Sequence, residues 1–274
     1  MPEGPEIRRA ADAVADCIVG RVASEVWFAF ERLKPFEAQL SGVEVCAVET
    51  RGKAMLTRFA NGLLIYSHNQ LYGRWYCCPA GERPDIPRQL RLAIDGDLSS
   101  ALLYSASDIT VLHESGLETH PFLSRLGPDV LDSRTDQALL LACLADRRFR
   151  NRQLGGLLTD QGFVAGLGNY LRCEILFVAG LSPRLRPVQL VDSQRCRLTE
   201  AILYLPRQSY ETAGITNDLA RAHELMAAGA DFESARFQVF RREGLPCYRC
   251  GAAIVKQVLG GLSTYLCRQC QAVT

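Results

Sequence analysis

The sequence lacks several features that would mark a membrane or secreted protein. None of its apolar runs approaches the length of about 20 residues that a membrane-spanning helix needs. The segment EIRRAADAVADCIVG near the start carries charges throughout, so we do not expect it to be a secretory signal. Internal repeats and low-complexity tracts are also absent. The 274 residues, 22% of them charged and 48% hydrophobic, instead indicate a soluble globular protein with room for two domains.

The net charge is only +1, but the charge is unevenly distributed along the chain. Residues 1–130 hold 13 Lys and Arg against 17 Asp and Glu, a balance of −4. Residues 131–274 hold 18 against 13, a balance of +5. A basic half of this kind fits a polyanionic partner, although an excess of five charges is also common on a plain solvated surface.

Eleven cysteines are present, but their pattern argues against a disulfide framework. Seven are scattered, namely Cys17, Cys46, Cys77, Cys78, Cys143, Cys173 and Cys196. An odd, scattered set in a chain without a secretion signal indicates reduced thiols, and we therefore expect a cytoplasmic protein.

The other four cysteines form two closely spaced pairs near the end of the chain. Cys247 and Cys250 are followed, after sixteen intervening residues, by Cys267 and Cys270. The intervening residues predict two short strands around Gly260-Gly261, a hairpin that would bring the two pairs together. Four thiolates in this arrangement suit one tetrahedral zinc ion with no open position for catalysis, whereas four independent buried thiols would rarely show this spacing. We predict one structural Zn²⁺.

Hydrophobic periodicity divides the rest of the chain into a strand-rich part and a helical part. Residues 5–19 predict an amphipathic helix. Short alternating runs between 22 and 106, with a hairpin signal at Asn61-Gly62, predict a β-sandwich. Residues 135–145 and 188–204 have helical patterns.

These patterns predict a division of the chain into four parts. The parts are an N-terminal β-sandwich domain at 1–122, a linker at 123–134, a helical domain at 135–235 and a zinc finger at 236–274. The stretch 212–235 is the least readable, and we assign it no role.

The opening MPEGPEIRR raises a separate question. Pro2 and Pro5 suit the first turn of a helix, where a missing N–H costs nothing. Alternatively, removal of Met1 would leave Pro2 as a free secondary amine beside the carboxylic acid of Glu3. Both explanations stay open on these residues alone.

Five motifs together resemble the formamidopyrimidine-DNA glycosylase and endonuclease VIII family of base-excision repair enzymes. They are MPEGPE at the start, RGKAML at 51–56, SHNQLYG at 67–73, GLGNYLRCEIL at 166–176 and the four-cysteine finger. The opening and the NQLYG motif are closer to the endonuclease VIII branch than to the purine-specific branch. The resemblance implies an α+β multidomain fold: an N-terminal β-sandwich with a leading helix, then a helical domain with a helix–two-turn–helix element, then a zinc finger hairpin.

The resemblance also assigns catalytic residues. Pro2 would attack the anomeric carbon of a deoxyribose, because an α-amine with a pKa near 8 has about a few hundred-fold more neutral form at pH 7 than a lysine. Glu3 would protonate the opening sugar, and Lys53 would be a further proton donor. Taken singly, Glu3 would only favour a helix dipole and Lys53 would be a solvated surface residue.

Further residues match positions at which the family contacts DNA. Gln70, Leu71 and Tyr72 would fill the space left by a flipped nucleotide, although Leu71 and Tyr72 could also be core residues at a strand end. Asn169 opens a helix whose backbone N–H groups would bind phosphate, and it could equally be a plain cap. Arg125 matches a DNA-contacting position. Such contacts position the duplex and read no sequence.

One residue departs from the family pattern. The family carries an arginine in the finger hairpin just after the glycine, where it grips phosphate and assists the δ-elimination step. In this chain the position is Leu262, in GGLSTYLC. Leucine can do neither, so δ-elimination is in doubt.

The sequence therefore predicts a bifunctional DNA glycosylase and abasic-site lyase that removes oxidised pyrimidines. Alternatives are a purine-specific formamidopyrimidine-type glycosylase and a catalytically impaired, zinc-dependent damaged-DNA-binding protein. The expected partner is double-stranded DNA with a damaged base or abasic site. We expect no membrane partner, a monomer, and a bacterial, nucleoid-associated location in the cytoplasm.

Overall fold

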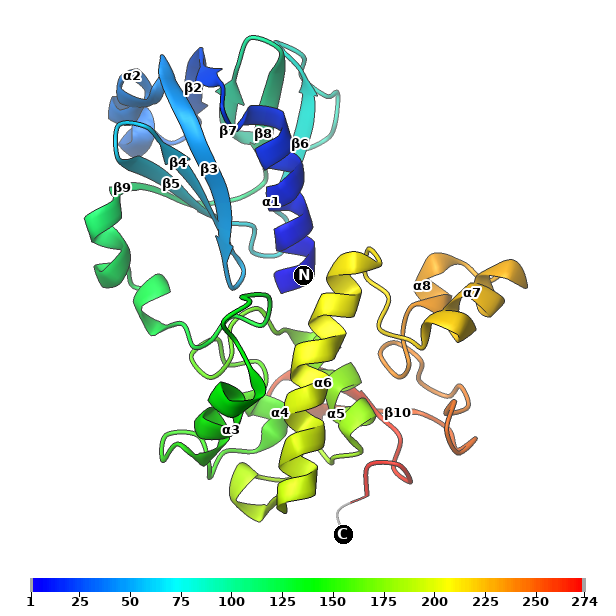
Figure 1. Ribbon diagram of the computed structural model, residues 1–274. Coiled ribbons are helices and arrows are strands. Elements are labelled where there is room, and N and C mark those ends of the chain that lie inside the picture. Colours follow the sequence, from blue (N-terminus) through cyan, green and yellow to red (C-terminus); the bar gives the residue numbers. More distant parts are fainter. Residues whose placement is uncertain (1, 273–274) are drawn as a thin grey trace. The chain divides into compact units, whose positions relative to one another are not determined.

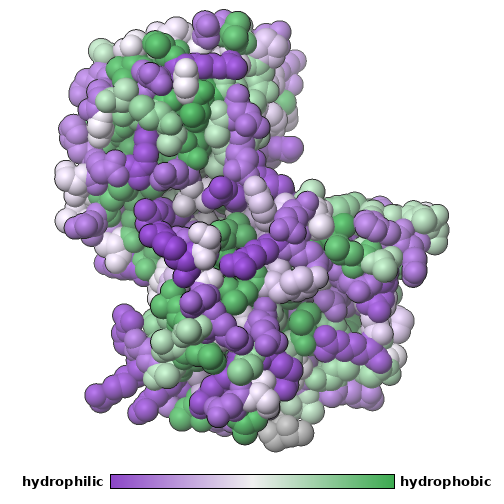
Figure 2. Space-filling model, in the orientation of Figure 1, coloured by the Kyte–Doolittle hydropathy of each residue, from purple (hydrophilic) through white to green (hydrophobic). Residues whose placement is uncertain are grey.

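The computed structural model describes residues 2–272, which divide into two compact units. Pro2 and residues 6–125 form the first unit, and residues 3–5 with the chain from Leu126 onward form the second (Figure 1). The division falls inside the predicted linker, and the helices and the finger share one unit. Within residues 2–272, no helix has the length and apolar character needed to cross a membrane. On the face in Figure 2, hydrophilic residues predominate, with apolar residues in small groups among them.

The first unit is an antiparallel β-sandwich. Its five-stranded sheet has the order β1 (Val22–Ala23), β3 (Val43–Arg51), β4 (Ala54–Phe59), β5 (Leu63–His68) and β9 (Asp108–His113). Its four-stranded sheet has the order β2 (Glu25–Phe28), β7 (Leu90–Asp95), β8 (Ser99–Tyr104) and β6 (Arg74–Pro79). The Asn61-Gly62 signal is confirmed, since Gly62 has φ +81° and joins β4 to β5.

The leading helix α1 (Gly4–Ile18) packs into the core of this sandwich. Val14 and Ile18 are buried there with Phe28 of β2 and Leu103 of β8. Gly20, at φ +75°, ends the turn after the helix and donates its N–H to the Val45 carbonyl at 2.9 Å. The predicted amphipathic helix is thus confirmed, and its apolar face is part of the sandwich core.

Short helices complete the first unit. They are η1 (Glu31–Phe36), α2 (Glu37–Leu40), η2 (Glu114–Thr119) and η3 (Leu123–Arg125). Leu117, Phe122 and Leu123 of the segment after β9 pack against Leu56 and Tyr66. This segment therefore covers the face of β4 and β5 that lies away from the main core.

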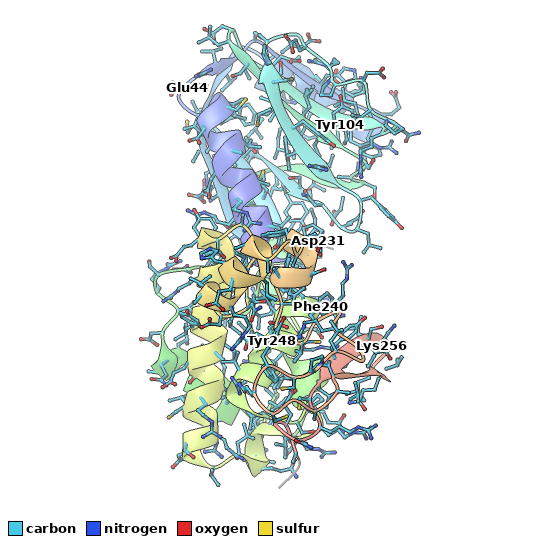
Figure 3. The ribbon with its side chains drawn as sticks, turned by 90° about the vertical axis from the view of Figure 1, so that its right-hand side faces the viewer. Glu44, Tyr104, Asp231, Phe240, Tyr248 and Lys256 are labelled. Carbon is cyan, nitrogen blue, oxygen red and sulfur yellow. The ribbon has the colours of Figure 1, made fainter. Side chains whose placement is uncertain are left out.

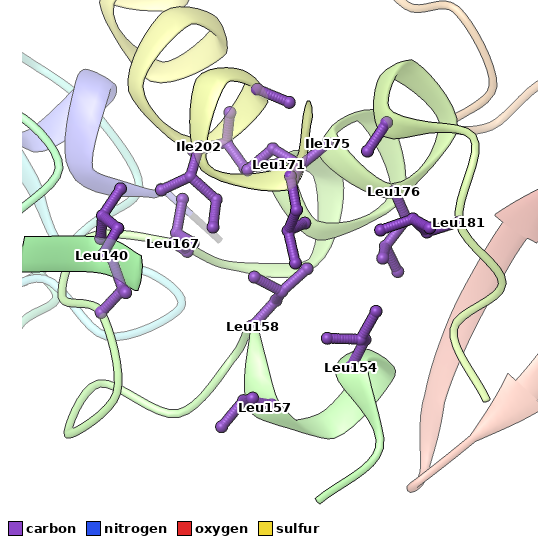
Figure 4. Packing of buried hydrophobic residues seen from close by; sticks show 14 of the residues in the cluster. Leu140, Leu154, Leu157, Leu158, Leu167, Leu171, Ile175, Leu176, Leu181 and Ile202 are labelled. Atoms are coloured by element: carbon purple, nitrogen blue, oxygen red, sulfur yellow. The ribbon is translucent and has the colours of Figure 1, made fainter. Parts of the chain in front are cut away.

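The second unit consists mainly of helices around one apolar core. They are α3 (Gln137–Ala145), α4 (Leu154–Leu157), α5 (Asn169–Ala179), η4 (Pro187–Gln189), α6 (Asp192–Glu211), α7 (Leu219–Ala227) and α8 (Phe232–Ala235). Figure 4 shows Leu171 and Ile175 of α5 packed with Ile202 of α6 and with Leu154 and Leu158. Nine of the eleven residues of α5 are buried, so α5 is the central helix of this unit.

The predicted helices at 135–145 and 188–204 correspond to α3 and to η4 with α6. The observed α6 is longer than predicted and continues through Pro206 to Glu211. Pro206 is buried, so packing outweighs the lost N–H hydrogen bond. The unreadable stretch 212–235 contains α7 and α8.

The finger is the hairpin of β10 (Val255–Leu259) and β11 (Leu262–Leu266). Gly260 and Gly261 form its turn with φ +58° and +77°, the left-handed pair that a two-residue hairpin loop requires. Cys173 and Phe177 of α5 are buried in one cluster with finger residues. The predicted fold class is confirmed, whereas the four domain bounds stay a prediction.

Candidate active site and zinc finger

Glu3 is held by the first turn of α5. Its carboxylate accepts the backbone N–H groups of Gly168, Tyr170 and Leu171 at 2.7, 2.8 and 3.3 Å. The next residue along, Gly4, donates its N–H to the Gly166 carbonyl at 2.7 Å. A helix N-terminus presents unpaired N–H groups and the positive end of its dipole, which is a favourable site for a carboxylate. Only 3% of Glu3 is exposed, so the acid is buried in these contacts.

The residue before the helix has to be a glycine. A Cβ atom on Gly168 would collide with Cγ, Cδ and Oε1 of Glu3. The second glycine of the GLG sequence therefore makes room for the acid. Three of the N–H groups at this helix start are occupied by the Glu3 carboxylate, while the predicted phosphate contact at Asn169 stays a prediction.

The Asn169 side chain is directed to the finger. Its amide donates to the Ser263 carbonyl at 2.9 Å, and its Oδ1 accepts a hydrogen bond from Arg172 at 2.6 Å. Arg172 is almost fully buried and also donates to Thr264 Oγ1 at 2.7 Å and to the Gly155 carbonyl at 3.0 Å. Asn169 and Arg172 thus join α5 to β11.

Glu174 is a second buried charge on α5 that sequence reasoning missed. Its carboxylate accepts the N–H groups of Gln238, Val239 and Phe240 at 2.8–2.9 Å and the Thr216 hydroxyl at 3.0 Å. Burial raises the pKa of Glu174, while these hydrogen bonds act in the opposite direction. The sequence does contain a signal for these buried charges: Arg and Glu both occur inside the apolar run NYLRCEILFVA. Such residues are seldom fully buried unless they are paired, so their presence there indicates buried polar contacts.

Lys53 lies in the turn between β3 and β4. It is only 8% exposed, and Gly52 before it has φ +61°. Ala54 pairs with His68 in the sheet, so Lys53 lies at the sheet end where β5 leads into the next loop. Burial lowers the pKa of His68 below its usual value, the charge of Asp108 acts against this shift, and the Lys53 charge adds to it. The reading of Lys53 as a plain solvated residue is therefore wrong.

The loop 69–73 follows β5 and presents its apolar groups to solvent. Leu71 is 55% exposed and Tyr72 is 69% exposed, so neither is a core residue. Gly73 donates its N–H to the Asn69 carbonyl at 2.7 Å, and a Cβ on Gly73 would lie 2.6 Å from that oxygen. The glycine therefore permits a turn tight enough to project Leu71 and Tyr72.

The remaining predicted residues divide between the units. Pro2 is partly buried, and Arg125 is exposed at the end of η3 in the first unit, which also holds Lys53 and the 69–73 loop. Glu3, Asn169 and the finger belong to the second unit. The roles assigned to these residues stay predictions.

The four finger cysteines converge on one point. All four sulfur atoms lie within 4.8 Å of one another, with Cys247–Cys270 at 3.8 Å and Cys250–Cys267 at 3.4 Å. Tetrahedral zinc with Zn–S bonds of about 2.3 Å separates its sulfur ligands by about 3.8 Å. The donor set and spacing therefore fit one structural zinc, and the cofactor prediction is confirmed.

Leu262 begins β11 directly after the two turn glycines and is 39% exposed. The nearest alternative cation along the hairpin is Lys256 on β10 (Figure 3), whose ammonium lies over the Tyr265 ring at 5.9 Å. Lys256 pairs with Tyr265, three residues away from the tip pair Leu259 and Leu262 on each strand. The tip position itself carries no cationic side chain.

Comparison with known proteins covers nearly the whole chain. Residues 1–106 match the formamidopyrimidine-DNA glycosylase N-terminal domain, 126–219 match its H2TH domain, and 244–273 match a zinc finger found in FPG and IleRS. Endonuclease 8 of Salmonella arizonae is 50% identical over 271 residues, covering 99% of this chain and 100% of that protein. Endonuclease 8 of Salmonella heidelberg is 51% identical with the same coverage.

Solved structures give the same fold. Lactococcus lactis Fpg (MutM), in complex with DNA containing N7-benzyl-Fapy-dG, aligns with a TM-score of 0.82 at 20% identity, covering 99% of this chain and 100% of that chain. Its complex with abasic-site DNA gives a TM-score of 0.81 at 20% identity, covering 98% and 99%. The fold and the domain matches define a DNA glycosylase with an H2TH domain and a zinc finger. From the identity over its full length, the chain belongs to the endonuclease 8 branch of the formamidopyrimidine-DNA glycosylase family. The prediction of an enzyme of this family is confirmed.

We expect the purified protein to contain one zinc per chain, measured by inductively coupled plasma mass spectrometry. Cys267→Ser should abolish stoichiometric zinc and make residues 236–274 protease-sensitive, because zinc binding supplies on the order of 10 kcal/mol of local folding free energy. Cys46→Ser, at an exposed cysteine of β3, is the control and should leave both properties unchanged. Active, freshly purified protein without zinc would contradict the assignment.

Proposed function

We propose that the protein is a bifunctional DNA glycosylase and abasic-site lyase that removes oxidised pyrimidines from double-stranded DNA. The observation that carries this function is the 50–51% identity to Salmonella endonuclease 8 across the whole chain. The exposed Leu71 and Tyr72, the buried Lys53 and the anchored Glu3 support it further.

Pro2 is the proposed nucleophile. With Met1 removed, its secondary amine attacks C1′ of the damaged nucleotide, a C–N bond forms, and the base leaves with the bonding electron pair of the glycosidic bond. The amine then loses its proton, and the C1′–O4′ bond breaks as the ring oxygen is protonated, which leaves a C=N iminium at C1′. This iminium carries no N–H and stays cationic, so it withdraws electrons from C2′. Loss of a C2′ proton then expels the 3′ phosphate by β-elimination.

Glu3 is the proposed proton carrier beside Pro2. Three backbone N–H groups donate to its side chain, an environment that suits a carboxylate. We therefore assign it two steps: it accepts the proton that the attacking amine loses, and it then gives that proton to the sugar ring oxygen as the ring opens. General acid–base catalysis of this kind contributes about 10²- to 10⁴-fold. Lys53 is a second proton donor in the proposal.

The loop residues Gln70, Leu71 and Tyr72 are the proposed wedge. Extruding a nucleotide costs a few kcal/mol in lost stacking and pairing, and an inserted apolar side chain compensates part of that cost. Leu71 and Tyr72 are exposed before any DNA is bound, so they need not leave a core to insert. Arg125 and Asn169 are proposed to position the DNA backbone.

We further propose a monomer in the bacterial cytoplasm, associated with the nucleoid, with the domain bounds 1–122, 123–134, 135–235 and 236–274. Double-stranded DNA with a damaged base or abasic site is the proposed partner. The Lactococcus lactis glycosylase with the same fold binds DNA containing an abasic site, which supports this choice. The purine-specific and binding-only alternatives stay as competing outcomes of the experiments, since Leu262 is compatible with a weakened enzyme.

We expect the active chain to lack Met1, because a peptide bond at Pro2 removes the nucleophile. Borohydride trapping on duplexes with 5-hydroxyuracil, 8-oxoguanine or an abasic site, paired with intact-mass measurement, tests this. The adduct should form with the oxidised pyrimidine and the abasic site, and its mass should correspond to the chain starting at Pro2. A form that retains a tag before Pro2 is the control and should form none.

Each other outcome has a definite meaning. Full incision by the tagged chain rules out the proline mechanism. Trapping with 8-oxoguanine but not 5-hydroxyuracil favours the purine-specific enzyme. Binding without any adduct favours the binding-only protein.

We expect Leu262→Arg to tighten DNA binding about ten- to a hundred-fold, because a charged hydrogen bond is worth about 1.5–3 kcal/mol. The salt dependence of binding should steepen by about one phosphate contact. The product should shift from a 3′ unsaturated aldehyde to a 3′ phosphate, as seen on a denaturing gel.

Val258→Arg is the matched control, since Val258 is 69% exposed on the same hairpin but away from the family position. It should tighten binding only modestly and leave the product end unchanged. If the unaltered protein already leaves mainly 3′ phosphate, and Leu262→Arg changes neither affinity nor products, the proposed effect of Leu262 is wrong.

A further inference from the structure

His68, the last residue of β5, bonds to the loop that carries the proposed wedge. Its Nδ1 accepts the backbone N–H of Gln70 at 3.0 Å. Gln70 has φ +51°, a left-handed conformation that a residue with a side chain adopts at some cost. The hydrogen bond from Gln70 to the ring therefore offsets the cost of the turn that follows the strand.

Other bonds hold the loop on either side of its exposed residues. The Gln70 side-chain oxygen accepts a hydrogen bond from Ser107 Oγ at 2.8 Å, and the Tyr72 carbonyl accepts one from Arg88 at 2.6 Å. The backbone is thus fixed at both ends, while the Leu71 and Tyr72 side chains project. Among the contacts described for the Gln70 backbone, the one to His68 involves a group that titrates near neutral pH.

The surroundings of His68 determine when its ring takes up a proton. Asp108 is its partner across β5 and β9, the Lys53 ammonium lies on the β3–β4 turn, and the Phe122 ring packs against it at 5.4 Å. Another histidine, His120, belongs to the same covering segment and stacks on Tyr66 at 4.3 Å. Burial is the largest effect and lowers the pKa of His68, with Lys53 adding to the shift and Asp108 opposing it. The ring is therefore neutral at pH 7.

We propose that His68 is a positioning residue for the wedge, whose unprotonated Nδ1 holds Gln70 in the left-handed turn that projects Leu71 and Tyr72. The proposal rests on the wedge function proposed above and deepens it. A proton on Nδ1 would turn the acceptor into a donor facing the Gln70 N–H, and the two groups would repel. Acidification therefore releases the loop.

The direction of the pH effect follows from the lowered pKa. The neutral ring is favoured in the folded loop, so its contribution is complete above the ordinary histidine pKa of about 6.5. This contribution to holding the loop is lost as the pH falls below about 6.5 and passes through the lower pKa that His68 has in the folded protein. Wedge insertion should consequently fail on the acid side, with a midpoint below 6.5.

Two substitutions at His68 distinguish the effect of the hydrogen-bond acceptor from the effect of the titrating ring. His68→Asn places its amide oxygen at the position of Nδ1, keeps an acceptor for the Gln70 N–H and does not titrate. His68→Leu keeps similar bulk but removes the acceptor. His113→Asn, at an exposed histidine ending β9, is the control for loss of a histidine.

The readout is 2-aminopurine fluorescence opposite a 5-hydroxyuracil lesion, recorded between pH 5 and 8 in the zinc-loaded protein. In the unaltered protein and in His113→Asn, the signal should fall on acidification. In His68→Asn the fluorescence change should be independent of pH. Its amplitude should match that of the unaltered protein at neutral pH within about threefold. In His68→Leu the equilibrium for insertion should fall about three- to tenfold at neutral pH, since a net hydrogen bond is worth about 0.5–1.5 kcal/mol.

The proposal is overturned if His68→Asn loses its signal with the same pH dependence as the unaltered protein, or if His68→Leu keeps the full signal. If His68→Leu does not fold, the pH profile of His68→Asn still decides. Failure of the wedge function looks different: the unaltered protein would form the borohydride adduct yet give no fluorescence change at any pH.

Discussion

The contact on which the site depends is the Glu3 carboxylate at the N-terminus of α5. Three backbone N–H groups donate to it at 2.7–3.3 Å, although they lie about 165 residues further along the sequence. These N–H groups would otherwise be unpaired, so one acid both caps the helix and fixes the start of the chain. Because Pro2 is bonded directly to Glu3, this contact limits the freedom of the proposed nucleophile.

The same helix supports the finger through buried charges. Arg172 and Glu174 are costly to bury, and each is compensated by several hydrogen bonds. Arg172 reaches β11, whereas Glu174 holds the segment 238–240 that leads to Cys247. Zinc then fixes the hairpin whose tip carries Leu262. The finger is therefore built onto α5, and a change at its tip can alter DNA binding without disturbing the anchor of Glu3.

Local sequence signals predicted a large part of this structure. The cysteine spacing, the Gly260-Gly261 turn and the Asn61-Gly62 hairpin are determined by residues close in sequence, and all three are confirmed. The predicted strand region ended at residue 106, so it did not include β9 (Asp108–His113), which completes the five-stranded sheet. The Glu3 anchor could not be read from sequence, since nothing local links an N-terminal acid to one helix among several. A phosphate was therefore the natural expectation for those N–H groups.

The central claim is that the anchored Glu3 carries a proton during base removal. Trapping of Glu3→Gln by borohydride, on a damaged-base duplex and on a pre-formed abasic duplex, tests it directly. The abasic sugar already opens in solution, so only base removal needs the proton transfer. Loss of about 10²-fold or more on the damaged base, with less than about tenfold loss on the abasic site, is the predicted result. Equal losses on both duplexes would show that Glu3 only anchors the chain and would contradict the account.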